Sequence, residues 1–205
     1  MASDAAFWDS IAEKYAARPI KDEAAYAKTL ERTRAHLRPD DRVIEFGCGT
    51  GTTAVKLAPA VGHYTATDIA ANMIAIGEVK ARDAHAANLT FLRGTLDDVW
   101  AEAPFDAVLA FNFLHLVDDL PAALARVRGL LDTGGLFISK TVCLSGAWLL
   151  MKPVIGVMQM MGRAPHLSFI APAALERAIA AAGFEIVETG NYPKTINRFD
   201  VARKM

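Results

Sequence analysis

The sequence predicts a single α/β domain built around a mostly parallel sheet, and three features indicate it. An apolar strand at residues 42–47 runs into a glycine-rich turn that opens directly into a helix. Further strand and helix patterns then alternate along the chain, as is typical of parallel sheets covered by helices. Asp68 ends the second strand, where open α/β sheets bind their ligands. A chain of 205 residues suits one domain with a sizeable core, so residues 1–205 are treated as one unit.

Two amphipathic helices are expected before the first strand. The first covers residues 4–17, where Asp4 supplies an N-cap and the apolar side chains fall near one face, namely Phe7, Trp8, Ile11 and Tyr15. Pro19 ends this helix, because proline has no amide hydrogen to donate. The second helix covers residues 22–37 and stops before the turn at 39–41.

After the glycine turn, apolar periodicity and turn residues predict the remaining elements. The expected strands are 63–68, 88–93, 105–112, 136–141, 184–188 and 196–204. The expected helices are 72–86, a helix that starts at Asp119 and ends at Gly134-Gly135, and 172–182. Neither an internal repeat nor a long linker interrupts this order in the sequence.

The turn Gly47-Cys48-Gly49-Thr50-Gly51 has the chemistry of a ligand cradle. Glycines at alternate positions permit backbone angles that a Cβ would forbid. They also let a ligand lie against the main chain, facing the amide groups at the helix N-terminus. A dinucleotide fingerprint would need its third glycine at position 52, which is Thr52. This departure opposes the alternative of a NAD-dependent oxidoreductase.

The run from Val43 to Gly51, with Glu45 before the glycines, resembles motif I of the class I methyltransferases that use S-adenosylmethionine (SAM). The similarity covers nearly the whole chain, notably segments 68–73, 105–117 and 182–187. It implies a Rossmann-like, seven-stranded, mostly parallel sheet in the order 3-2-1-4-5-7-6, with the last strand antiparallel and helices on both faces. It also implies SAM as the cofactor and S-adenosylhomocysteine (SAH) as the product.

By this resemblance, the cofactor-binding residues lie in the first helix and in the loops after the first four strands. Asp68 is expected to accept hydrogen bonds from both ribose hydroxyls, as acids at strand ends do in dinucleotide sites. The loop after the third strand has Thr95 where the family often has an acid, so the adenine meets Thr95, Leu96 and main-chain atoms, or Asp97. The full expected set is Tyr15, Glu45, Gly47, Cys48, Gly49, Thr50, Gly51, Asp68, Ile69, Met73, Thr95, Leu96, Phe111 and Asn112.

The expected acceptor site holds four side chains: Trp8, His115, Trp148 and His166. Since SAM carries its own leaving group, the chemistry requires neither a triad nor a metal, and no metal site is expected. His115 is the candidate catalytic base, because an imidazole titrates near neutrality. The alternative for His115 is packing beside the cofactor, and for Trp8 it is packing on the sheet. Ser168 follows His166 toward the same pocket.

Two segments are expected to cover the site: an N-terminal helical lid at 1–38 and an apolar insertion at 143–170. The insertion is rich in methionine, which supplies an adaptable apolar wall. One interpretation is a lid, which either covers a hydrophobic substrate or lies at an interface. The alternative is an ordinary pair of helices that pack on the core. Lys152-Pro153 interrupts it, which opposes a transmembrane span.

Composition excludes several classes of function. The net charge is -1 without a basic stripe, so nucleic acid is not an expected partner. Two cysteines, Cys48 and Cys143, indicate neither a disulfide framework nor a zinc site. The acidic N-terminal residues lack the apolar core of a secretory signal, so the expected location is the cytoplasm.

These observations predict a SAM-dependent methyltransferase that acts on a small-molecule acceptor by in-line displacement. One alternative is a lipid- or quinone-type methyltransferase at the membrane surface, with only peripheral membrane contact. Another is a SAM-binding module without catalysis, because the glycine turn and Asp68 report only on cofactor binding. Neither the acceptor nor the oligomeric state follows from the sequence.

Overall fold

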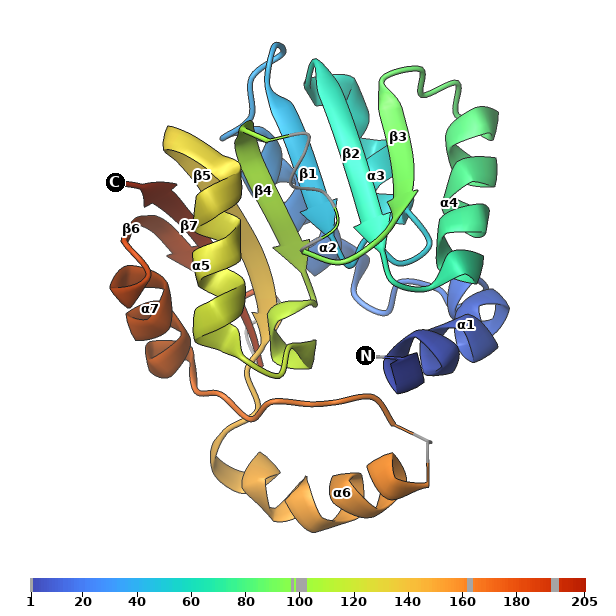
Figure 1. The fold of residues 1–205 in the computed structure, drawn as a ribbon, viewed down its shortest axis with the longest axis vertical. Coiled ribbons are helices and arrows are strands. Elements are labelled where there is room, and N and C mark those ends of the chain that lie inside the picture. The colour runs from blue at the N-terminus through green and yellow to red at the C-terminus, as the bar shows by residue number, and fades with distance from the viewer. Residues whose placement is uncertain (1, 97, 99–102, 162–163, 193–195) are drawn as a thin grey trace.

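The computed structural model describes residues 2–96, 98, 103–161, 164–192 and 196–205 (Figure 1). One seven-stranded sheet has the order β3-β2-β1-β4-β5-β7-β6. The strands are β1 (Arg42–Phe46), β2 (His63–Asp68), β3 (Leu89–Arg93), β4 (Phe105–Phe111), β5 (Leu131–Val142), β6 (Phe184–Gly190) and β7 (Asn197–Lys204). Strands β1 to β5 pair in parallel, whereas β7 runs antiparallel to both β5 and β6. The predicted fold class and strand order are therefore confirmed.

Helices cover both faces of this sheet. They are α1 (Ala2–Ala16), α2 (Glu23–Arg34), α3 (Thr52–Leu57), α4 (Ala71–Asp83), α5 (Leu120–Leu130), α6 (Lys152–Met160) and α7 (Pro172–Ala181), with short 3₁₀ turns η1 (Ala58–Ala60), η3 (Leu114–Leu116) and η4 (Gly146–Met151). Side chains of α2, α3 and α4 share one core layer, and those of α5 and α7 share the other. Burial on both faces explains why the central strands are almost continuously apolar.

Short polar side chains begin two of these helices. Asp22 caps α2 by accepting a hydrogen bond from the Ala25 amide at 2.9 Å. Asp119 caps α5 in the same way, with the Ala122 amide at 2.9 Å. Each cap supplies a partner for an amide that the first helical turn leaves without one.

The prediction for the end of α5 is wrong. The helix ends at Leu130 rather than at Gly134-Gly135, and β5 begins at once with Leu131. Leu131 pairs with Phe105 and Leu136 pairs with Ala107, so four residues of β5 loop out between these two pairs. Gly134, with φ 82°, makes that irregularity possible. The glycine pair is therefore part of a strand and does not end a helix.

Helix α1 lies against α4, next to the carboxyl ends of β1 and β2 (Figure 1). Asp9 accepts a hydrogen bond from the Asn72 amide at 2.8 Å, which fixes α1 to the start of α4. Trp8 packs on a small core cluster made by Ala12 and Met73. Helix α6 lies beyond the same end of the sheet, away from both helical layers (Figure 1). None of the described helices is long and apolar enough to cross a membrane.

Candidate active site

A cavity of about 400 Å³ lies where the parallel strands end. The loops after β1 and β4 leave the sheet here in opposite directions, which makes this the topological switch point where open α/β sheets bind ligands. Its volume falls within the range of small-molecule sites. The predicted site residues that line it are Trp8, Tyr15, Gly47, Gly49, Asp68, Ile69, Met73, Thr95, Leu96, Phe111, Asn112 and His166.

The glycine loop forms one wall of this cavity. Gly47, Gly49 and Gly51 all have positive φ, at 67°, 55° and 71°. A Cβ on Gly47 would lie 2.7 Å from the Phe113 ring, and one on Gly51 would lie 2.5 Å from the Phe91 ring. A Cβ on Gly49 would instead meet only Tyr15 Cε1, at 3.8 Å. The first and third glycines therefore allow close packing, whereas the second turns its open side to the cavity.

Asp68 is held in place by two backbone amides. Its Oδ2 accepts a hydrogen bond from Gly49 at 2.9 Å, and its Oδ1 accepts one from Ala70 at 3.0 Å. Burial raises the pKa of Asp68, and these two amides act in the opposite direction. Each carboxylate oxygen can accept a further hydrogen bond, and Asp68 lines the cavity. The glycine loop and the acid after β2 thus form one rigid unit.

Four of the expected cofactor residues are not among those that line the cavity, and they are Glu45, Cys48, Thr50 and Gly51. Glu45 is buried and accepts a hydrogen bond from the Tyr64 hydroxyl at 2.9 Å, and burial raises its pKa to about 7. Thr50 is also buried and accepts a hydrogen bond from Lys80 Nζ at 2.9 Å. The structure places these side chains where they support the loop from within the protein.

The loop after β3 is closed by Asp98. Its Oδ2 accepts hydrogen bonds from both the amide and the hydroxyl of Thr95, each at 2.9 Å. Thr95 and Leu96, the expected partners of the adenine, line the cavity. Asp97, the alternative partner of the adenine, lies outside the described residues.

His115, the candidate base, lies apart from the cavity lining. Its side chain is buried, and burial lowers its pKa to about 4. Its backbone oxygen accepts a hydrogen bond from the Ser168 amide at 2.7 Å. Trp148 is also apart from the lining, because it lies in η4 with 46% of its surface exposed. Of the four expected acceptor residues, Trp8 and His166 line the cavity.

His166 belongs to a chain of polar contacts at the cavity wall. Its Nδ1 lies 3.1 Å from Asp118 Oδ1, and its Nε2 lies 3.1 Å from Ser168 Oγ. The Ser168 hydroxyl donates a hydrogen bond to the Val117 carbonyl at 3.2 Å. The Asp4 carboxylate lies 3.4 Å from the His166 amide nitrogen, which donates to it. The imidazole is therefore held on both sides of its ring.

The sequence interpretation missed several residues of this wall. The sequence pattern assigns Asp119 only to the start of a helix, and it does not assign Phe113, Leu116, Val117, Asp118 or Arg126 to the site. A position directly after β4 is the signal that could have identified all of these except Arg126. Arg126 lies further into α5, so its approach to the cavity depends on the angle of that helix.

Known proteins resemble this chain over most of its length. A family model described as a methyltransferase domain matches residues 18–189. The highly reducing polyketide synthase lcsB of Purpureocillium lilacinum is 29% identical over 147 residues, which cover 66% of this chain and 6% of that protein. The ubiquinone biosynthesis O-methyltransferase of Xylella fastidiosa (strain 9a5c) is 30% identical over 153 residues, which cover 71% and 61%. The chain thus matches less than two thirds of the length of either relative.

The fold also matches solved structures. The structure of the DhpI–SAH complex superimposes with a TM-score of 0.78 and 23% identity. The match covers 99% of this chain and 96% of that one, so the two share their fold from end to end. The cavity described above lies at the carboxyl ends of the strands of this shared fold.

Proposed function

This chain belongs to the class I SAM-dependent methyltransferases, and from that membership we propose that it methylates a small-molecule acceptor bound beside SAM. One observation supports this most strongly. A single cavity joins the glycine loop and Asp68 on one side to His166 and an apolar wall on the other. Methyl transfer requires such an arrangement, because cofactor and acceptor must lie in line within one enclosed space.

The residues present fit SAM. Gly49 has positive φ, and the atom nearest to the place of its missing Cβ is Tyr15 Cε1 at 3.8 Å, so the backbone of the loop is not covered by a side chain of its own where a ligand would approach. Asp68 offers acceptors for the ribose hydroxyls, and Ile69, Met73 and Leu96 offer apolar surface for the adenine. When bound, SAM supplies a methyl group on a sulfonium, whose departure needs no acid from the protein.

The acceptor wall is apolar with a few polar groups. Phe113, Leu116 and Val117 line it together with His166 and Asp118. Such a wall suits a molecule with an apolar body and one polar atom that receives the methyl group. The carboxylate of Asp118 faces Nδ1 of His166, so it orients the imidazole toward the site. We propose His166 as the group that takes a proton from the acceptor where the acceptor arrives protonated.

His115 does not suit that role as well. It is buried apart from the cavity lining, and its pKa of about 4 makes it a weak base at neutral pH. His166 instead has Nε2 directed at Ser168, whose hydroxyl already donates to Val117. To act as a base, His166 must hold its proton on Nδ1, against Asp118, and present an unprotonated Nε2 to the acceptor. The acceptor hydroxyl then donates to Nε2 in place of the contact with Ser168, whose own hydroxyl keeps its hydrogen bond to Val117. The proposed role for His115 is packing against the segment that carries Ser168.

Replacing His166 tests this assignment. His166→Gln should lower kcat by about a hundredfold, the lower end of the usual contribution of a general base. The affinity for SAH should stay unchanged. The assay measures SAH formed from SAM with each member of a panel of hydroxyl, amine and thiol acceptors.

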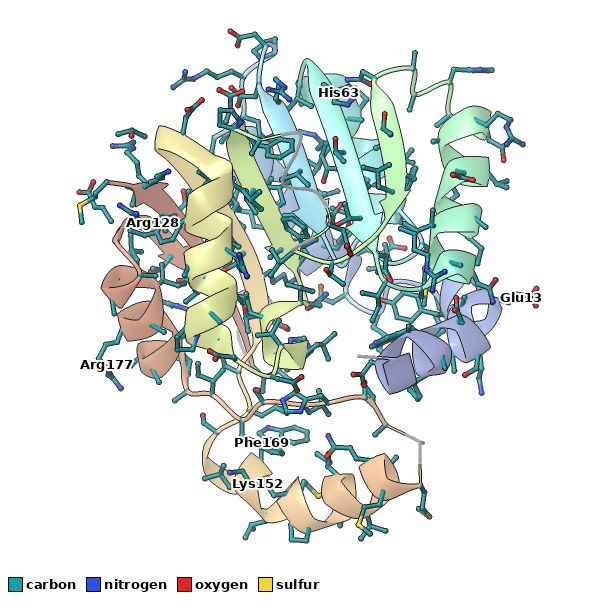
Figure 2. All side chains as sticks on the ribbon, viewed as in Figure 1. Glu13, His63, Arg128, Lys152, Phe169 and Arg177 are labelled. Carbon is teal, nitrogen blue, oxygen red and sulfur yellow. The ribbon has the colours of Figure 1, made fainter. Side chains whose placement is uncertain are left out.

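His63 provides a matched control for this variant. It begins β2, at the end of the sheet far from α6 and the carboxyl ends of the strands (Figure 2). His63→Gln should therefore turn over like the unaltered protein. Equal kcat in the His63 and His166 variants would show that His166 does not act as the base. Tight SAH binding with no turnover on any acceptor would instead favour a SAM-binding module without catalysis.

A quinone- or lipid-type acceptor is the second candidate. The relative named as a ubiquinone biosynthesis O-methyltransferase favours it, as does the apolar wall of Phe113, Leu116 and Val117. Turnover of a tailed phenol should then exceed that of the same phenol without its tail. Equal turnover of both compounds would leave the smaller acceptor as the better assignment.

A further inference from the structure

An apolar face covers the outside of η4 and α6. Its members are large apolar side chains that are each between 38% and 89% exposed: Trp148, Leu149, Leu150, Met151, Val154, Val157, Met158, Met160 and Met161. Leu150 and Met160 are the most exposed, at 81% and 89%. Every residue of α6 is at least partly exposed, and the helix packs mainly against η4. A continuous apolar face of this kind marks an interaction surface.

Helix α6 turns polar side chains toward the protein and apolar side chains outward, which is the reverse of an ordinary surface helix. Its polar Gln159 turns toward the protein and donates a hydrogen bond to the Pro165 carbonyl at 2.9 Å. Lys152 lies 5.2 Å from the centre of the Phe169 ring, and Figure 2 shows both side chains between α6 and the segment that follows it. Surface helices normally turn such groups outward and bury their apolar side chains. Here the polar groups hold the helix in place and the apolar side chains face out.

The charges of this region identify the partner. Between Asp132 and Glu176 the sequence contains no Asp or Glu, and the exposed Lys152 begins α6. Trp148 adds an aromatic ring of the kind that prefers the boundary between apolar and polar phases. A second copy of this chain would bring no acidic side chain from the same segment to Lys152, whereas an anionic lipid surface would supply the opposite charge. We propose that η4 and α6 dock the protein on an anionic lipid surface.

The position of this face adds to the argument. Helix α6 lies beyond the carboxyl ends of the strands, on the side of the molecule that holds the cavity (Figure 1). The segment after α6 reaches the cavity directly, because Pro165 and His166 line it. Docking by the apolar face therefore brings the lipid surface to the same end of the sheet as the cavity. The proposal does not depend on which acceptor is methylated.

The test is co-sedimentation of the full chain with vesicles. Vesicles of phosphatidylcholine and phosphatidylglycerol in equal parts should bind the protein, and vesicles of phosphatidylcholine alone should bind it less. The double variant Leu150→Glu/Met160→Glu should partition roughly a hundredfold more weakly, since interfacial binding scales with the apolar area that enters the membrane. Neither residue lines the cavity, so SAH affinity and the unfolding midpoint should stay unchanged.

Val79 supplies the matched control. It is 49% exposed on α4, away from the apolar face, so Val79→Glu should leave vesicle binding intact. The proposal is overturned if the unaltered protein binds neither kind of vesicle, or if the double variant binds as well as the Val79 variant. It is also overturned if the unaltered protein forms a dimer that the double variant dissociates while vesicles remain unbound. SAH binding in each variant separates any of these failures from a failure of the proposed methyltransferase function.

Discussion

Asp68→Ala should weaken the binding of SAH by about a hundredfold, because it removes a charged acceptor for two hydroxyl groups. The variant should remain folded. Asp68 and Gly49 line the cavity, so water can take the place of the lost carboxylate beside the Gly49 and Ala70 amides, which Asp68 holds at 2.9 and 3.0 Å. Calorimetric titration measures the affinity, and thermal unfolding measures the effect on the fold.

Asp106 makes the matched control possible. It also accepts a hydrogen bond from a backbone amide, that of Arg42 at 2.8 Å, but it lies at the opposite ends of β1 and β4. Asp106→Ala should therefore reproduce any general effect of losing such an acid while keeping SAH affinity. Equal SAH affinity in a folded Asp68→Ala protein and in the unaltered one would contradict the placement of the ribose at Asp68.

Asp200→Asn should stabilise the protein at neutral and alkaline pH, which is the second large effect expected. Asp200 lies in β7 with 1% of its surface exposed, opposite Ser139 of β5. Among the described residues neither of its oxygens accepts a hydrogen bond, and the nearest cation is Arg198, whose Nε is 3.4 Å from Oδ1. Burial raises the pKa of Asp200 to about 7, so its ionised form opposes folding.

Asp200 makes the free energy of unfolding depend on pH, because its pKa differs between the folded and the unfolded protein. The folded protein keeps the proton on Asp200 up to about pH 7, whereas the unfolded chain loses it near pH 4. The contribution of Asp200 to the free energy of unfolding is therefore fully present below about pH 4, and it is lost as the pH rises through about 7. A difference of about three pKa units corresponds to as much as about 4 kcal/mol at alkaline pH.

Urea unfolding at acid and alkaline pH measures this prediction. Asn has almost the same volume as Asp but carries no charge, so the cost of burying an ionised carboxylate at position 200 disappears. Arg198 keeps Glu176, whose Oε1 lies 2.6 Å from its Nη2. The advantage of Asp200→Asn should shrink toward pH 4, and the exposed control Asp132→Asn should show no such trend. A variant less stable than the unaltered protein near pH 8 would contradict the buried, destabilising carboxylate.

The sequence predicted the sheet well because its signals are local. A strand followed by Gly47, Gly49 and Gly51 specifies a turn with positive φ wherever it occurs, and the strand boundaries follow from buried apolar runs. The end of α5 was predicted wrongly because a local signal can be ambiguous. Gly134-Gly135 looks the same in sequence at a helix end and in a strand irregularity, and only the pairing of β5 with β4 separates the two.

The site residues were harder to place than the strands. His115 follows β4 and His166 follows α6, and the burial of both depends on how the segment around Ser168 crosses the loop after β4. Glu45 lies two residues before the first glycine of the turn, yet strand alternation directs it to Tyr64. Contacts between segments far apart in sequence decide each of these positions, and a single sequence does not encode such contacts in any local pattern.

Calorimetric titration of the purified protein with SAH, with NAD titrated in parallel, tests the central claim most directly. The claim is that the loop from Gly47 to Gly51 and Asp68 bind SAM and its product rather than a dinucleotide. We expect saturable binding of SAH at one site per chain and no heat from NAD. Binding of NAD without binding of SAH would contradict the assignment of the cavity, and with it the proposed transfer of a methyl group.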